Sequence, residues 1–385
     1  MGVSATGLAE SGGVRAGQRI EHLDTPTILV DLDRMERNIA AWQGVADANG
    51  VRLRPHIKTH KVPAIALKQV EAGARGIIAA KVSEAEPFIA AGIDDVCIAY
   101  PVFGEDKWAR IARHAARGVK LTVNCDNDGA ARQASHAAEA ADATIRLQID
   151  VDSGMHRGGI PMDRIDEIER LARAIQSLPG LEFDGLTTHR GIWYEGSPGP
   201  ADAGHDEGQL LVDLAEKLRA GGLEVREITA GGTFTGKWVA EVPGVTETRA
   251  GTYVYYDLMH INAGTADWDE LALTALCRVV SHPSPDRVTI DGGSKTFSGD
   301  RGVVGGSTFA KVNDLAVGAD RKVFVERLTE EHGMARAEEP VELGDRIRFY
   351  PFHACTCANL TNEVVAHRGG TVEAVWKVDA RGLRQ

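Results

Sequence analysis

The chain has 385 residues, 25% of them charged and 43% hydrophobic, with a formal net charge of −12 at pH 7. This is the composition of a folded globular protein, long enough for a large barrel and a second domain. The negative charge argues against a nucleic-acid partner, and no apolar run of about 18 residues occurs, so we expect no membrane span.

The first 21 residues lack the apolar core of a secretory signal, so we expect a flexible leader over 1–21 and a cytoplasmic protein. The five cysteines are sparse and odd in number, which does not fit a disulfide framework. Small molecules are therefore the expected partners.

From residue 51 onward, short β-rich runs alternate with amphipathic helical stretches. The predicted strands are 51–56, 75–80, 95–100, 119–124, 144–151, 182–188, 225–229 and 246–250. The predicted helices are 61–72, 83–91, 105–117, 127–140, 161–177 and 205–220, with a weak segment at 235–242. This alternation favours an α/β fold with a (β/α)8 TIM barrel, although an open doubly wound sheet is the alternative.

After residue 262 the pattern changes to strands without long helices. These predicted strands are 271–281, 286–291, 320–327, 345–350, 361–367 and 371–376. An early strand, 27–32, precedes the barrel units, and we expect it to pair with this later region. The predicted domains are a barrel over 33–262 and a mostly antiparallel β domain formed by 22–32 plus 263–385.

Barrels of this kind carry their chemistry at the carboxyl ends of the strands, and the first such end is RPHIKTHK, residues 54–61. Lys58 lies there among other cationic groups. A cationic or desolvating environment lowers the pKa of a lysine and suits it to Schiff-base chemistry. A solvated basic loop is the alternative interpretation.

Two glycine loops follow the seventh and eighth strands. The first, TAGGTFTGK at 229–237, offers backbone N–H groups to a phosphate and nearly matches a P-loop. Trp238 stands where a P-loop needs Ser or Thr, which favours a cofactor phosphate over ATP. The second is RAGTY at 249–253, and barrels often build phosphate sites from these last two loops. Plain glycine turns are the alternative.

Near the C-terminus, PFHACTC at 351–357 brings one imidazole close to two thiols. In a strand-like run His353 and Cys355 face the same side, so both reach one metal, and Cys357 is a further candidate. Imidazole with thiolate suits zinc, whereas a redox cysteine pair is the competing interpretation.

Three further residues follow the fifth and sixth strands. Arg157 lies in a glycine loop and is a candidate to bind an oxyanion or a phenolate, although such arginines are often structural. His189 and Tyr194 are general acid/base candidates by residue type alone.

These segments together resemble one family. They are RPHIKTHK, KVSEAEPFIAAGI at 81–93, IDVDSGMHRGGI at 149–160, the two glycine loops, DGGSKT at 291–296, EEHG at 330–333 and HAC at 353–355. The family is the D-threonine aldolase and D-serine dehydratase family of fold-type III pyridoxal phosphate enzymes, related in fold to alanine racemase. The resemblance extends from about residue 22 to residue 383.

The resemblance implies a pyridoxal 5'-phosphate cofactor, a divalent metal (Zn, Mn or Mg), a small D-β-hydroxy amino acid substrate and a homodimer. It implies that Lys58 binds the cofactor, that Arg157 lies near the cofactor ring, and that His353 and Cys355 bind the metal. The implied phosphate-binding residues are Gly232, Thr233, Gly251, Thr252 and Tyr253.

The resemblance leaves two lyase reactions open. The overall pattern favours D-threonine aldolase, which cleaves its substrate to glycine and an aldehyde. The site favours a D-serine or D-3-hydroxyaspartate dehydratase, because aldolases carry His-x-Asp where this chain has His353-Ala354-Cys355. The loop 189–195 has Glu195 where aldolases place a histidine, and Tyr194 aligns with a dehydratase tyrosine. His60, His189 and Glu195 are candidate bases, and a racemase or a non-catalytic pyridoxal phosphate-binding protein are the remaining alternatives.

Overall fold

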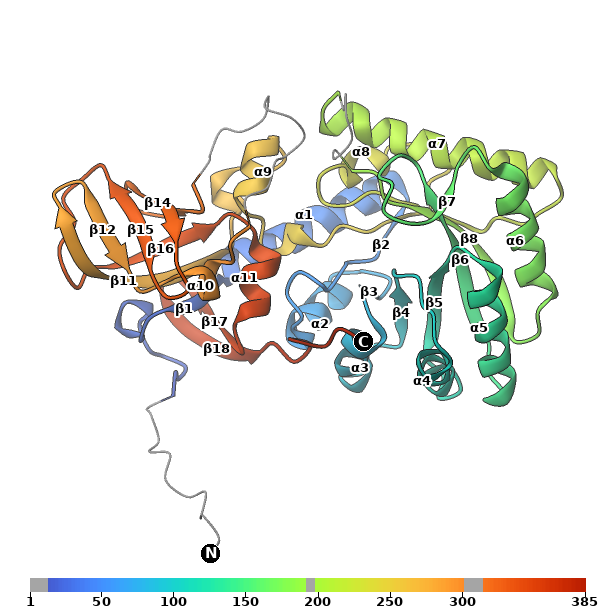
Figure 1. Ribbon diagram of the computed structural model, residues 1–385, viewed down its shortest axis with the longest axis horizontal. Coiled ribbons are helices and arrows are strands. Elements are labelled where there is room, and N and C mark those ends of the chain that lie inside the picture. Colours follow the sequence, from blue (N-terminus) through green and yellow to red (C-terminus); the bar gives the residue numbers. More distant parts are fainter. Residues whose placement is uncertain (1–12, 192–197, 301–313) are drawn as a thin grey trace, which may run out of the picture.

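The computed structural model describes residues 13–191, 198–300 and 314–385, which are arranged around two separate sheets (Figure 1). One sheet forms a barrel and the other forms a β domain beside it. In the described residues, no helix combines the length and apolarity that crossing a membrane requires.

The barrel has eight parallel strands in the spatial order β2-β10-β9-β8-β6-β5-β4-β3. They are β2 (Arg52–Leu53), β3 (Ile77–Ala79), β4 (Asp95–Ile98), β5 (Lys120–Cys125), β6 (Ile145–Asp152), β8 (Leu181–Thr188), β9 (Glu227–Ala230) and β10 (Glu247–Thr248), while the short β7 (Ile160–Pro161) pairs with β6. The barrel closes where Ile78 donates its N–H to the Pro55 carbonyl (2.7 Å) and Ile57 donates to the Ile78 carbonyl (2.8 Å). The predicted (β/α)8 fold is thus confirmed, and the open sheet is excluded.

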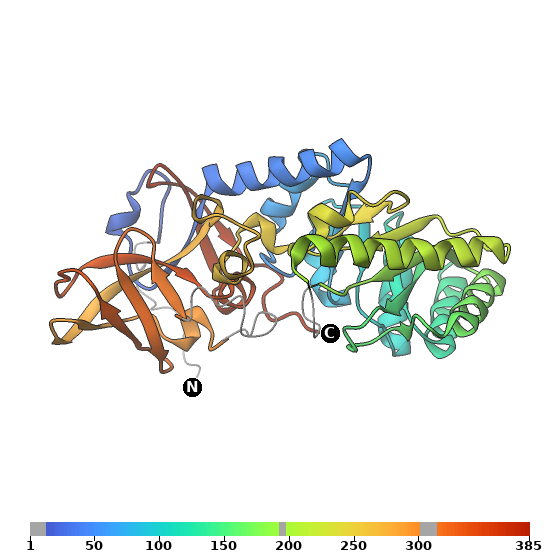
Figure 2. The same cartoon turned by 90° about the horizontal axis from the view of Figure 1, so that it is seen from above.

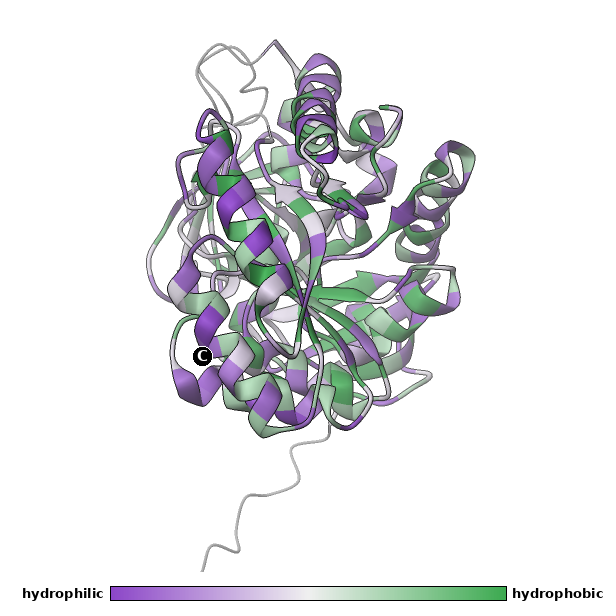
Figure 3. Cartoon of the chain, turned by 90° about the vertical axis from the view of Figure 1, so that its right-hand side faces the viewer, coloured by the Kyte–Doolittle hydropathy of each residue, from purple (hydrophilic) through white to green (hydrophobic). Residues whose placement is uncertain are grey.

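Helices surround the barrel strands (Figure 2). They are α2 (Pro63–Glu71), α3 (Val82–Ala90), α4 (Glu105–Ala115), α5 (Asp128–Ala140), α6 (Ile165–Ser177), α7 (Pro200–Ala220) and the short α8 (Gly236–Val239). Viewed from the barrel end, hydrophobic colour concentrates on the central strands and hydrophilic colour on the outer helices (Figure 3). All four residues of β4 are buried, as expected for a parallel strand that helices cover.

One long helix, α1 (Leu32–Asn49), was not predicted. Its signals are nevertheless local: the Asp31 side chain accepts from Arg34 N at its start, and Gly50 ends it at φ 65°. Buried α1 residues, such as Trp42, share a core cluster with β-domain residues such as Phe349. The helix therefore packs between the two sheets.

The β domain has nine strands in the order β12-β15-β14-β13-β16-β11-β1-β17-β18. They are β1 (Thr27–Asp31), β11 (Leu273–Ser284), β12 (Arg287–Ile290), β13 (Ala316–Gly318), β14 (Val323–Leu328), β15 (Gly333–Ala337), β16 (Arg346–Pro351), β17 (Glu363–Arg368) and β18 (Thr371–Lys377). β1 pairs antiparallel with β11 and parallel with β17, so the early strand does join this sheet. β13 and β15 are short strands that the sequence did not predict.

Short helices complete the description. They are α9 (Leu258–Ala263), α10 (Ser294–Phe297), α11 (Ala354–Leu360) and the 3-10 turns Ile20–His22, Thr252–Val254 and Trp268–Glu270. The prediction that residues 353–357 form a strand-like run is wrong, because only His353 is extended (φ −131°, ψ 106°) before α11 begins.

The last residues depart from the predicted division into domains. Ala380 belongs to the barrel core cluster and donates its N–H to the Lys61 carbonyl (3.2 Å). Ser83, in α3, donates its N–H to the Gln385 carbonyl (2.8 Å). The C-terminal end of the β domain therefore returns to the barrel beside the segment that carries Lys58.

Candidate active site

Residues of the barrel and of the start of α11 line one cavity of about 540 Å³. The candidates that line it are Lys58, Arg157, His189, Gly232, Thr233, Gly251, Thr252, His353 and Cys355. The barrel residues follow the carboxyl ends of their strands, whereas His353 and Cys355 come from the start of α11. The structure therefore brings most of the candidates together.

Lys58 follows β2, and its side chain is exposed to this cavity. Desolvation by the surrounding walls lowers its pKa below the usual value, and the charges of Arg157 and Arg249 act in the same direction, while Cys355 and Glu84 oppose them. Solvent in the cavity moderates the effect. The shift favours the neutral amine, which is the nucleophilic form.

The two glycine loops meet at the hydroxyl of Thr233. Its Oγ1 accepts from the N–H groups of Gly251 (3.1 Å) and Tyr253 (3.3 Å). A Cβ on Gly232 would lie 3.0 Å from Cε1 of His189, and a Cβ on Gly251 would lie 2.8 Å from the His56 carbonyl oxygen. The close approach requires glycine at Gly251, and converging N–H groups are suited to a phosphate oxygen.

Arg249 is a cavity residue to which the sequence analysis gave no role. It donates from one terminal nitrogen to Thr187 Oγ1 (2.5 Å) and from the other to the Thr188 carbonyl. Its position directly before the Gly251 loop, at the end of a barrel strand, was the available signal.

Arg249 also acts on two imidazoles in the cavity. Burial, together with the charges of Arg249, Lys58 and Arg157, holds the pKa of His189 well below its usual range. Burial, Lys58, Arg249 and His189 do the same for the pKa of His56. Both rings are therefore neutral near pH 7 and are able to accept a proton.

His56, Asn124 and Asp150 also line the cavity, although none was a candidate. Burial raises the pKa of Asp150 even though Arg249 and Arg157 oppose the shift. Each of these residues lies on or just beyond a barrel strand, so the signal was position and not residue type.

The proposed metal pair lies at the start of α11. Cys355 Sγ lies 3.3 Å from Thr59 Oγ1 and 3.6 Å from Thr252 Oγ1, and His353 Nδ1 lies 2.8 Å from Asp300 Oδ2. Burial opposes charge on both members of the pair. Even so, Cys355 raises the pKa of His353 to about 10, and His353 lowers the pKa of Cys355.

The donor set of this pair is one nitrogen and one sulfur, which suits a divalent metal. Within 13–191, 198–300 and 314–385, no three His, Cys, Asp or Glu side chains form a preassembled metal site. A metal bound here would need ligands from water or substrate in addition.

Cys357 does not join the pair. It is buried, and its Sγ donates to the Thr296 carbonyl at 3.1 Å. In a helix, positions two apart are about 200° apart around the axis, so Cys355 and Cys357 point in different directions. This geometry corrects the strand-based prediction and removes the redox cysteine pair.

Two candidates among the described residues, His60 and Tyr253, do not line the cavity. His60 is fully buried between the rings of Phe88 and Tyr255, and burial lowers its pKa to about 3. Because its ring does not line the cavity, we withdraw it as a base. The Tyr253 hydroxyl accepts from Gln69 Nε2 in the core (2.8 Å), so only its backbone faces the glycine loops. Tyr194 lies outside the described residues, as does Glu195.

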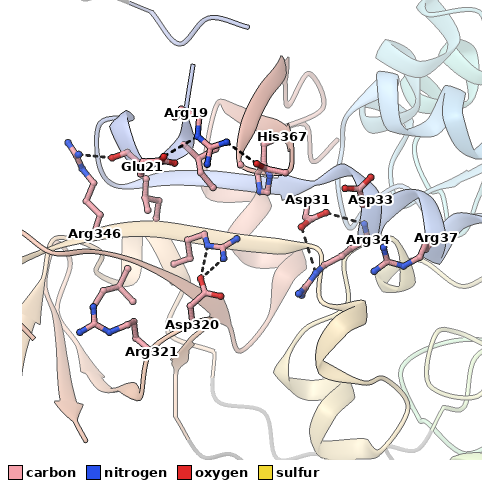
Figure 4. Close-up of a pocket in the computed structure, with 16 residues that line it drawn as sticks. Arg19, Glu21, Asp31, Asp33, Arg34, Arg37, Asp320, Arg321, Arg346 and His367 are labelled. Carbon is pink, nitrogen blue, oxygen red and sulfur yellow. Dashed lines mark hydrogen bonds and ion pairs between the residues drawn. The ribbon is translucent and has the colours of Figure 1, made fainter. Parts of the chain in front are cut away.

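A second cavity, of about 620 Å³, opens on the β domain (Figure 4). Its arginines and carboxylates largely pair with one another: Arg348 Nε donates to Asp320 (3.1 Å), and Arg34 Nε lies 3.7 Å from Asp31. None of the described candidates lines it. The first cavity is therefore the candidate active site.

Comparisons with known proteins show the family to which the chain belongs. Residues 30–258 match the family described as "Alanine racemase, N-terminal domain", and residues 272–367 match "Putative serine dehydratase domain". A D-threonine aldolase from Arthrobacter sp is 35% identical over 98% of each chain. A D-threo-3-hydroxyaspartate dehydratase from Delftia sp. is 34% identical over 86% of this chain and 91% of its own.

Solved structures are similar over nearly the whole chain. A D-threonine aldolase from Filomicrobium marinum has a TM-score of 0.87 and 31% identity, covering 97% of this chain and 100% of its own. Two variants of a D-threo-3-hydroxyaspartate dehydratase have TM-scores of 0.83 and 0.80 and identities of 29% and 28%, each covering 94% of this chain and 96% and 98% of their own. One replaces a histidine by alanine; the other, in a metal-free form, replaces a cysteine two positions later.

Proposed function

The chain belongs to the family of D-threonine aldolases and D-serine dehydratases, and we propose that it is a lyase dependent on pyridoxal phosphate and a divalent metal. Its substrates in this proposal are small D-β-hydroxy-α-amino acids, cleaved as by D-threonine aldolase to glycine and an aldehyde. The observation that carries the proposal is that Lys58 and the His353–Cys355 pair line one cavity.

The cavity suits a phosphate-bearing aldehyde cofactor. The neutral amine of Lys58 would hold its carbonyl carbon covalently. The loop residues that line the cavity, Gly232, Thr233, Gly251 and Thr252, would hold its phosphate, while the Tyr253 N–H would support the loop through its bond to Thr233. Arg157 supplies a positive charge on the cavity wall. When bound, pyridoxal phosphate supplies the electron sink of the reaction.

The chain's own residues would divide the remaining tasks. His353 and Cys355 would hold a divalent cation (Zn, Mn or Mg), whose chemistry there is that of a Lewis acid for the substrate hydroxyl. In aldol cleavage a base removes the hydroxyl proton, and the neutral ring of His189 is the described residue we assign to it.

Dehydration is the second candidate, and one specific observation favours it. The spacing of His353 and Cys355 equals the spacing of the histidine and cysteine replaced in the dehydratase variants. In that reaction Lys58 would remove the proton from Cα and the hydroxyl group would leave as water. Hydrolysis of the released enamine would then give a keto acid and ammonia. Lys58 therefore serves both reactions.

A product assay tests the proposal. Purified protein supplied with cofactor and Mn²⁺ is incubated with D-threonine, D-serine and D-3-hydroxyaspartate, and the products are separated. Glycine with an aldehyde supports the aldolase, whereas a keto acid with ammonia supports the dehydratase. Absence of all products refutes the activity.

Two controls accompany the assay. Lys58→Ala should remove the visible absorbance of the bound cofactor together with the activity. Sedimentation of the same preparation tests the proposed homodimer, and a monomer at assay concentration would contradict it.

A further inference from the structure

One buried carboxylate, that of Asp257, joins the barrel to the start of α11. Asp257 is 1% exposed and stands at the N-terminus of α9. Its Oδ1 accepts from the backbone N–H (3.4 Å) and from Nδ1 (2.7 Å) of His260. Its Oδ2 accepts from the backbone N–H of Ala354 at 2.9 Å. The same side chain therefore caps one helix and anchors another that is 97 residues away in sequence.

The anchored residue lies between the two proposed metal ligands. Ala354 is the first residue of α11, and its neighbours in sequence are His353 and Cys355. A backbone N–H in the first turn of a helix has no partner within the helix, so an external acceptor fixes the position of that turn. Fixing Ala354 restricts the backbone from which both ligands extend.

A second contact makes this anchor rigid. The His260 ring stacks on Phe234, with centroids 4.1 Å apart and an interplanar angle of 6°, and Phe234 lines the active-site cavity. Met259, beside His260, donates its N–H to the Phe352 carbonyl (3.3 Å), one residue before His353. The α9–α11 junction is thus tied at two backbone positions.

We propose that Asp257 is a positioning residue for the proposed metal site, because it fixes the backbone from which His353 and Cys355 extend. The inference rests on the proposed function only in taking these two residues as ligands. It assigns Asp257 no contact with the metal, because both of its oxygens are already hydrogen-bonded to protein donors.

The test measures metal binding and not activity. Mn²⁺ is titrated into cofactor-loaded protein, and the free ion is followed by electron paramagnetic resonance. Asp257→Asn leaves one acceptor oxygen for two sets of donors, those of His260 and the N–H of Ala354, so one of these contacts has to be lost. We expect its Mn²⁺ dissociation constant to rise about 10- to 100-fold, as is typical when a residue that orients a metal ligand is lost. The cofactor absorbance should be unchanged.

A matched control and a second variant complete the design. Asp267→Asn changes another helix-capping aspartate, at the 3-10 turn Trp268–Glu270, and should leave the dissociation constant unchanged. Ala354→Pro removes the N–H that Asp257 binds. Proline is tolerated at the first helical position, and the extended His353 suits a residue before proline, so this variant decides the matter if Asp257→Asn does not fold.

The outcomes separate the two proposals. Wild-type protein that binds no Mn²⁺ overturns the metal site and this inference with it. Wild-type protein that binds Mn²⁺, with Asp257→Asn or Ala354→Pro binding it equally tightly, overturns the positioning role alone. A parallel loss of cofactor absorbance and metal binding in both variants would show general unfolding and would also overturn it.

Discussion

The substitution Gly251→Ala tests the phosphate-binding loop most directly. The added Cβ would lie 2.8 Å from the carbonyl oxygen and 3.1 Å from the Cβ of His56. His56 cannot simply retreat, because its own N–H donates to the Ala250 carbonyl at 2.9 Å and so holds the two segments together. Overpacking of this kind costs about 1–3 kcal/mol.

Separating the Gly251 loop from the segment that carries Lys58 would relieve that strain. The two segments would hold opposite ends of the cofactor, so the separation should weaken its binding. If the whole cost falls on binding, the dissociation constant of pyridoxal phosphate rises roughly 5- to 160-fold. Titration of cofactor-free protein, followed by visible absorbance, measures this rise, and urea unfolding measures any part of the cost that falls on the free protein.

Gly44→Ala is the matched control. Gly44 lies within α1, and a Cβ there would meet nothing within 4 Å. Alanine in a helix interior should stabilise the protein by about 0.5–1 kcal/mol and leave cofactor affinity unchanged. If Gly251→Ala has the wild-type dissociation constant for the cofactor and the wild-type free energy of unfolding, the reasoning about the close approach at Gly251 is wrong.

Three further predictions concern the cavity. Cys355→Ala should weaken Mn²⁺ binding at least about tenfold. Cys357→Ala should change the Mn²⁺ affinity less than about twofold, because the Cys357 thiol faces the core. Equal losses of affinity in the two variants would contradict the orientation of α11. In cofactor-free protein, the rate of acylation of Lys58 should rise with pH around a midpoint below 10.5, the usual pKa of lysine. Arg157→Gln should move that midpoint upward because it removes a positive charge that repels the protonated amine. An unchanged midpoint would argue against the electrostatic coupling between Arg157 and Lys58. His189→Gln should reduce glycine formation about 100-fold and keto acid formation much less, as measured by the product ratio, and an equal reduction of both would exclude it as the hydroxyl base.

The barrel was predictable because its pattern is local. Each parallel strand is a short apolar run covered by an amphipathic helix, so the strand and helix periods alternate along the sequence. That alternation located all eight strands to within a few residues, and the strand ends then located Lys58, Arg157 and Gly251. The rule that barrels carry their functional residues at the carboxyl ends of the strands identified these positions as site candidates.

The errors arose where side-chain direction depends on tertiary contacts. His60 lies two residues after Lys58, yet the chain turns between them and places its ring in the core beside Phe88. Periodicity could not distinguish a strand from a helix in the five residues from His353 to Cys357, and the two assignments orient Cys357 oppositely. The hydrogen bond from Cys357 to the Thr296 carbonyl shows which way the Cys357 side chain points, and the sequence around Cys357 does not reveal this distant contact.

The candidate active site is assembled from the Lys58 segment, which follows β2 of the barrel, and the start of α11, which follows β16 of the β domain, and one contact couples them. Thr59, the neighbour of Lys58, lies against Cys355 across 296 positions of sequence. A shift of α11 would therefore affect the residue next to Lys58, and a shift of the Lys58 segment would affect Cys355, the proposed metal ligand. Because Lys58 serves both proposed reactions, the difference between them has to come from groups that face the substrate hydroxyl: the pair at the start of α11 and the bases opposite it. If the proposed ligands are correct, the position of α11, and hence its hydrogen bond to Asp257, should affect the reaction together with the identity of the ligands.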